Sequence, residues 1–139
     1  MPLEELFQLP REGSRQLTVL EPGEIITGLH IPKLAADSKS TYLKAMERKV
    51  WSFALASIAL FLTLDDRKIK DARVVLGGVA PKPWRLPQIE AVLLNQQITP
   101  EIINQAAESA VTGAQPLSRN NYKIALVKGL IIEALSSLK

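Results

Sequence analysis

The chain has 139 residues, of which 47% are hydrophobic and 22% are charged, and its formal net charge is +3. These values are typical of one folded globular domain and argue against a disordered chain. The net charge is small and only 5% of the residues are aromatic, so we expect no nucleic-acid partner.

Cysteine is absent, and His30 is the single histidine. The chain therefore offers no disulfide, zinc-thiolate site, iron–sulfur ligand or cysteine nucleophile. A metal site needs several convergent ligands, so we expect none and interpret His30 as an exposed strand residue. The acidic N-terminus does not resemble a signal peptide, and the longest apolar run, residues 53–64, is too short to span a bilayer. We expect a cytoplasmic protein with no membrane partner.

The first half of the chain has the composition of β-strands. Residues 1–13 are interrupted by Pro10 and Gly13 and are expected to be irregular. A β-branched run predicts a strand over residues 25–31, and alternation predicts another over 41–46. The apolar run 54–64, a charged turn and the run 69–76 predict a β-hairpin. A buried helix over 54–64 is the alternative.

The second half has helical patterns. Pro87 suits the first turn of a helix. Thr99, Pro100 and Glu101 form a stronger start, with a cap, a first-turn proline and an acid at the positive end of the helix dipole. Gly113 is a candidate C-terminal stop, and a last helix is expected from Asn120 or Asn121 almost to the end. Strands followed by helices predict an α+β fold, in which three helices pack on one face of a small antiparallel sheet of three or four strands.

The residues themselves predict no catalytic site. The acids Asp65 and Asp66 lie in a predicted hairpin turn, where carboxylates are common for conformational reasons. The serines lack the Gly-x-Ser-x-Gly setting of a hydrolase, and no glycine-rich phosphate loop is present. The run Gly77–Pro87 joins the two halves, and its prolines are expected to end the sheet and turn the chain into the helical layer.

Four segments nevertheless resemble one family, in the family's order. They are residues 20–32, residues 42–57, the run with Gly77, Gly78 and Pro83-Trp84-Arg85 followed by Glu90, and residues 113–123 with Asn121-Tyr122-Lys123. The chain resembles the C-terminal domain of the FAD-binding (medium) subunit of molybdenum hydroxylases, the xanthine dehydrogenase and CO dehydrogenase flavoprotein family. The sequence of Lys82–Pro87 is most similar to that of FAD subunits of the aromatic aldehyde oxidoreductase type.

The resemblance implies a component of an oxidoreductase that is not catalytic alone. In this family a molybdopterin subunit hydroxylates the substrate, and electrons pass through [2Fe–2S] clusters to FAD and then to an acceptor. The implied partners are the N-terminal FAD-binding domain and the molybdopterin and [2Fe–2S] subunits. FAD belongs to the full subunit. Because the family's glycine-rich pyrophosphate loops lie outside these residues, we expect this chain alone not to bind FAD tightly.

The resemblance also implies three cofactor-binding residues. Lys44 matches a family lysine near the flavin, where a cation would stabilise the reduced ring. Ile26 and Thr27 match a position that packs on the flavin edge. Ordinary strand roles are the alternative for all three residues.

Two domain assignments follow from the same resemblance. Residues 1–32 are expected to be a remnant of the preceding FAD-binding subdomain plus the first strand, and residues 33–139 the CO dehydrogenase flavoprotein C-terminal-like domain. The alternative function is a stand-alone interaction or oligomerisation module that has lost flavin binding, and a homo-oligomer stays open under either reading.

Overall fold

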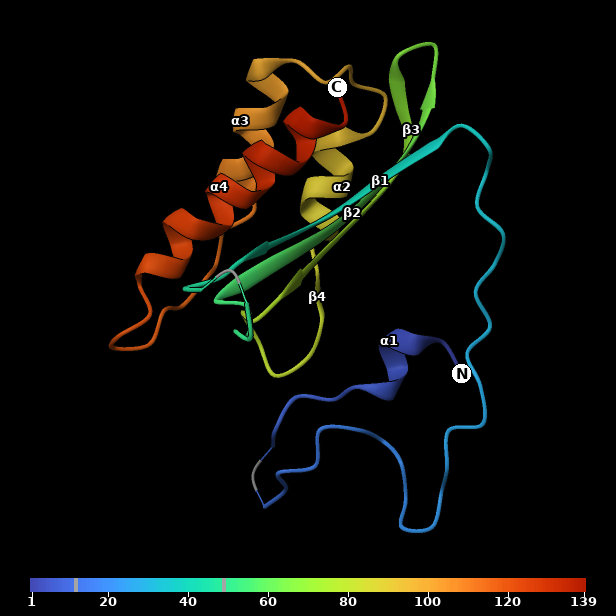
Figure 1. Ribbon diagram of the computed structural model, residues 1–139, viewed down its shortest axis with the longest axis vertical. Coiled ribbons are helices and arrows are strands. Elements are labelled where there is room, and N and C mark those ends of the chain that lie inside the picture. Colours follow the sequence, from blue (N-terminus) through green and yellow to red (C-terminus); the bar gives the residue numbers. More distant parts are fainter. Residues whose placement is uncertain (12, 49) are drawn as a thin grey trace.

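The computed structural model describes residues 1–11, 13–48 and 50–139, and its sheet is an antiparallel meander in the order β1-β2-β3-β4 (Figure 1). The strands are β1 (Ser38–Ala45), β2 (Ala56–Asp65), β3 (Lys68–Gly77) and β4 (Trp84–Arg85). The predicted strand over 41–46 and the predicted hairpin are confirmed. The helical alternative for 54–64 is wrong, because this stretch pairs along both edges, with β1 and with β3.

The turn between β2 and β3 explains the charged residues at its tip. Asp65 pairs with Lys68, so Asp66 and Arg67 form a two-residue connection. Both have positive φ, 46° and 63°. Two left-handed residues in succession are the geometry of a type I′ turn, whose twist matches that of the flanking strands. Asp65 and Asp66 therefore lie at the hairpin turn, as the sequence predicted.

Three helices cover one face of the sheet (Figure 1). They are α2 (Pro87–Leu93), α3 (Pro100–Ser109) and α4 (Tyr122–Ser137). The predicted cap is confirmed, because Thr99 Oγ1 accepts a hydrogen bond of 3.4 Å from the Ile102 N–H. The predicted stop is displaced, since α3 ends at Ser109 and Gly113 belongs to the turn that follows it.

The core lies between the helices and one face of the sheet. Alternate residues of β2 are buried there, and Leu43 of β1 packs against them. The largest fully buried side chains are Ile58, Leu60, Leu62, Ile69, Val74, Leu86, Ile89, Leu93, Ile131 and Leu135. The α+β fold with three helices on one face is confirmed.

The predicted strand over residues 25–31 is wrong. Residues 24–35 form no strand, and Ile25, Leu29 and Ile31 are 83%, 70% and 79% exposed. His30 is exposed as expected, but it does not lie in a strand. A β-branched run favours extended backbone, whereas a strand also needs a neighbour that shares its hydrogen bonds.

Two short elements lie where the sequence predicted none. Residues 3–6, expected to be irregular, form the single-turn helix α1 (Leu3–Leu6). The sheet does not end at Gly77 and Gly78, because Trp84 and Arg85 pair back onto Leu76 and Val75 as β4. Proline is tolerated next to a short edge strand, since no further strand needs its missing N–H.

Gly78 and Gly129 should respond to alanine in opposite directions. Gly78 has φ +72°, and a Cβ there would lie 3.1 Å from the Leu55 carbonyl oxygen, whereas nothing lies within 4 Å of a Cβ on Gly129 in α4. We expect Gly78→Ala to lower the free energy of unfolding by about 1–3 kcal/mol. Gly129→Ala should raise it by about 0.5–1 kcal/mol. Urea denaturation of both variants measures the difference, and an equal response at the two positions would contradict it.

Candidate functional site

Lys44 lies on the face of the sheet opposite to the one that α2, α3 and α4 cover. Its neighbour Leu43 packs against the core, and side chains alternate along a strand, so Lys44 and Tyr42 project from the opposite face. Both side chains are exposed. Across the ladder Lys44 pairs with Ser57, which pairs in turn with Gly77. The ammonium group of Lys44 is therefore available to a partner on this face of the sheet, which we call the open face.

The strip beside Lys44 carries little side-chain bulk. Ala59, the partner of Tyr42, is small, and Gly77 has no side chain. A Cβ on Gly77 would lie 2.5 Å from Ser57 Oγ, so the Ser57 hydroxyl occupies the space that a side chain at position 77 would need. A cation beside small residues is chemically suited to the edge of a planar, electron-accepting ring.

Ile26 and Thr27 lie in the extended segment before β1, and both are exposed. Neither of the two larger cavities is lined by Ile26, Thr27 or Lys44. Among the described residues, no hydrogen bond connects Ile26 or Thr27 to Lys44. Sequence reasoning grouped the three residues by resemblance, and the structure does not assemble them into one site.

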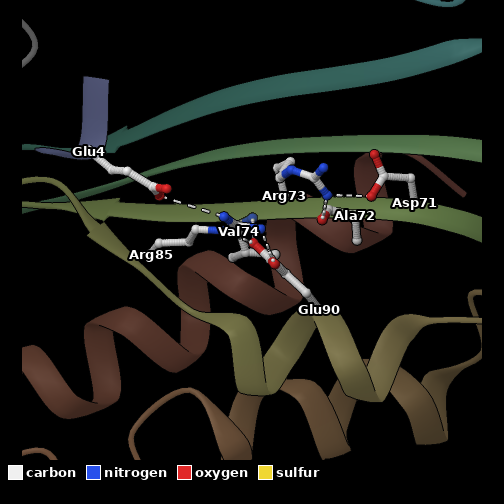
Figure 2. Close-up of polar contacts among 7 residues, drawn as sticks. All are labelled: Glu4, Asp71, Ala72, Arg73, Val74, Arg85 and Glu90. Atoms are coloured by element: carbon white, nitrogen blue, oxygen red, sulfur yellow. Dashed lines mark hydrogen bonds and ion pairs between the residues drawn. The ribbon is translucent and has the colours of Figure 1, made fainter. Parts of the chain in front are cut away.

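Arg85 and Glu90, which carry part of the resemblance, form the main polar cluster (Figure 2). Glu90 Oε1 accepts from Arg85 Nε at 2.9 Å, and Oε2 accepts from Nη2 at 2.8 Å. Glu90 Oε1 also accepts from the Val74 N–H at 3.0 Å, and Arg85 Nη1 lies 3.7 Å from Glu4 Oε2. The cluster ties α2 and β4 to β3, so these signature residues have a structural role.

The pKa values of this pair follow from the same contacts. Burial opposes the charge of Glu90, but the hydrogen bonds from Arg85 and the Val74 N–H outweigh it, so the pKa of Glu90 is below its ordinary value. The hydrogen bond to Glu90 holds the pKa of Arg85 above its own ordinary value against desolvation. Both groups stay charged at neutral pH, which suits an ion pair and not a proton donor.

The loop between β1 and β2 exposes two aromatic residues that sequence reasoning did not single out. Trp51 is 93% exposed and Phe53 97% exposed. Trp51 also has φ +56°, and its carbonyl oxygen accepts from Arg48 Nη2 at 3.3 Å. Large aromatic side chains are typical anchors of protein interfaces. No local signal in the sequence predicted this exposure.

The described residues line two sizeable cavities that open on the surface. One of about 350 Å³ lies between the end of β3, the run after it, and the connection from α3 to α4. The other, of about 530 Å³, lies between α1 and the β3–β4 edge and is lined by Phe7, Val75 and Trp84 among others.

No group of three or more His, Asp or Glu side chains in the described part of the chain is placed to hold a metal ion. None of the described helices combines the length and apolar character needed to cross a bilayer.

Comparison with known proteins decides the family. The model of the CO dehydrogenase flavoprotein C-terminal domain matches residues 41–138, which include most of β1, the strands β2 to β4 and the three packed helices. The chain belongs to this family. The CO dehydrogenase flavoprotein C-terminal domain is thus the unit that carries the Lys44 face, the Arg85–Glu90 pair and the smaller cavity.

Individual relatives agree with this assignment. The medium chain of glyceraldehyde dehydrogenase from Sulfolobus acidocaldarius is 28% identical over 84% of this chain. The FAD-binding subunit PaoB of the aldehyde oxidoreductase from Escherichia coli is 29% identical over 99% of it. A solved CO dehydrogenase from Hydrogenophaga pseudoflava superimposes on 86% of the chain with a TM-score of 0.79 and 28% identity. The chain spans only 42%, 40% and 43% of the lengths of these three relatives.

Proposed function

We propose that this chain works as the C-terminal domain of the FAD subunit of a molybdenum hydroxylase of the xanthine or aldehyde oxidoreductase type. The family match over residues 41–138 is the observation that carries the proposal. Two relatives support it, one an aldehyde oxidoreductase FAD-binding subunit and one a carbon monoxide dehydrogenase medium chain. The proposed partners are the N-terminal FAD-binding domain and the molybdopterin and [2Fe–2S] subunits, and the proposed compartment is the cytoplasm.

The open face of the sheet fits one part of FAD. When bound to the complete subunit, FAD would accept electrons from the iron–sulfur clusters and pass them to an acceptor. The exposed ammonium of Lys44 would stabilise negative charge on the ring, and the small residues beside it leave room for a planar group. Ile26 and Thr27 would pack on the ring edge once the preceding segment is held by its partner. We propose that the chain alone does not bind FAD tightly.

The exposed apolar surface supports a partner for residues 1–32. Ile25, Leu29 and Ile31 lie exposed on an extended segment without strand neighbours, and Trp51 and Phe53 are exposed in the loop after β1. An extended run of this kind can complete a sheet provided by another domain. We infer that residues 1–32 belong to the preceding FAD-binding subdomain and that residues 33–139 form the C-terminal domain.

The alternative is a stand-alone module that associates through the same surface with a second copy of itself. The exposed apolar residues favour an interaction of some kind, and they suit this role as well. Under the alternative the chain would form a stable homo-oligomer and would not join a flavin-binding partner.

The test is to mix the chain with the flavin-binding portion of the same subunit, supplied as a separate polypeptide. We expect a one-to-one complex with bound FAD by size-exclusion chromatography and flavin absorbance, and no flavin on the chain alone. Leu29→Ser should weaken the complex, whereas Leu117→Ser, equally exposed but between α3 and α4, should not. In the complex Lys44→Met should make the flavin potential more negative, with Lys70→Met as the control. A homo-oligomer that excludes the flavin-binding portion would favour the alternative.

A further inference from the structure

Two of the segments that carry the family resemblance meet at the smaller cavity. Val79 lies after β3 and Trp84 in β4, whereas Ala114 and Asn120 lie in the connection before α4 and Lys123 in its first turn. The two runs are far apart in the sequence, and a hydrogen bond of 2.6 Å from Lys123 Nζ to the Gly78 carbonyl oxygen joins them. The proposed flavin contacts lie elsewhere, on the open face of the sheet. The cavity is therefore a separate feature of this domain.

The walls of the cavity are mainly apolar. Leu76, Leu86, Val111, Ile124 and Val127 contribute to them, together with the indole of Trp84. Its volume of about 350 Å³ lies within the range of small-molecule sites and is too small for a helix or a folded domain. The cavity therefore suits a compact body with an apolar or aromatic surface.

The polar groups of the cavity favour an anion. Lys123 is the one charged side chain among the described residues that line it, and no carboxylate lines it. Two of the three ammonium hydrogens remain after the bond to Gly78. Asn120 Oδ1 already accepts from the Leu117 N–H at 2.6 Å, which leaves the Asn120 amide to act as a donor. Donors with one positive charge and no acid are complementary to a carboxylate.

We propose that this cavity binds a small organic carboxylate with an apolar or aromatic body. The carboxylate is held by Lys123 and Asn120, and the body lies against Trp84 and the aliphatic wall. The site is formed entirely by this chain, so the proposal stands independently of the flavin function.

Benzoate is the probe, and the fluorescence of Trp84 is the readout. The chain has two tryptophans, so Trp51→Phe leaves Trp84 as the single tryptophan, which can be excited selectively. We expect benzoate to quench this fluorescence saturably in the full chain. Benzamide keeps the shape of benzoate but lacks its charge, so it should bind at least about tenfold more weakly than benzoate. Lys123→Gln should weaken benzoate binding by a similar factor, and Lys123→Arg should retain most of it. Lys128→Gln, on the same helix but paired with Glu108, should not change it.

A second variant tests the cavity without touching its charge. Ala114→Leu should fill the cavity and abolish binding while the cation remains. Thermal denaturation of each variant shows whether it is folded. If Lys123→Gln does not fold, Lys123→Arg and Ala114→Leu still test whether the cavity binds benzoate. Equal binding of benzoate and benzamide, unchanged binding by Ala114→Leu, or no saturable quenching up to tens of millimolar benzoate would overturn the proposal.

Discussion

Changing Leu135 to alanine should lower the free energy of unfolding by about 2–5 kcal/mol. Leu135 lies on the face of α4 that packs on the sheet, in the same buried layer as Ile58, Leu60 and Val74, and it is 1% exposed. The variant loses the transfer free energy of the removed methyl groups. It also leaves a cavity that a sheet and a helix, both held by other contacts, cannot close.

Ile132 provides the matched control on the same helix. It is 40% exposed, so its side chain already contacts water in the folded state. Ile132→Ala should cost less than about 1 kcal/mol. Urea denaturation followed by circular dichroism measures both variants, and the m-value should stay constant. Equal losses at the two positions would mean that α4 does not pack through this face.

The second large effect is expected at Glu90, whose carboxylate satisfies groups on two other elements. Glu90→Leu keeps a similar volume but leaves the Val74 N–H and the Arg85 guanidinium without their acceptor. The side chain of Glu90 is only 13% exposed, so water replaces these bonds poorly. We expect a loss of about 2–3 kcal/mol. Glu90→Gln should lose less, because its amide oxygen can still accept from Val74.

The contribution of Glu90 should also depend on pH in a defined direction. Its folded pKa lies below the ordinary value of about 4.5, so the unfolded chain binds the proton more readily. The stabilisation is therefore complete above that ordinary value and is lost as the pH falls through the lowered folded pKa. The stability gap between the wild-type chain and Glu90→Gln should be constant near neutral pH and should close in acid.

Denaturation curves from pH 7 down to the acid limit of folding test this dependence. Glu108→Gln is the control, because its ion pair with Lys128 is largely exposed and should contribute less than about 1 kcal/mol. A gap for Glu90→Gln that widens in acid would contradict the assigned direction of the pKa shift.

Local signals explain which elements could be predicted. Thr99 and Pro100 specify a helix start within a few residues, since a cap and a first-turn proline act on adjacent backbone groups. The acids at the β2–β3 turn likewise indicate a tight connection. Residues 25–31 have the local pattern of a strand, but they pair with no strand of the described sheet. The pattern was correct about the extended backbone and wrong about the pairing.

The candidate site was less accessible to sequence reasoning. Alternation along β1 predicts that Lys44 and Leu43 face opposite ways, and the structure confirms this. Nothing local indicates that Trp51 and Phe53 would be left in solvent. The contact of Arg85 and Glu90 with the Val74 N–H joins three elements, so it depends on how α2 and β4 lie against β3.

Periodicity, caps and turn residues act over short distances, and they were enough to predict the α+β class, the hairpin and the three helices. The family followed from the resemblance of four segments. The structure was needed to show that Trp84 and Arg85 form a fourth strand and that Lys44 faces away from α2, α3 and α4 beside small residues. It also brought the run after β3 and the connection into α4 to one cavity. Such features require residues distant in the chain to meet, and that depends on how the helices pack on the sheet.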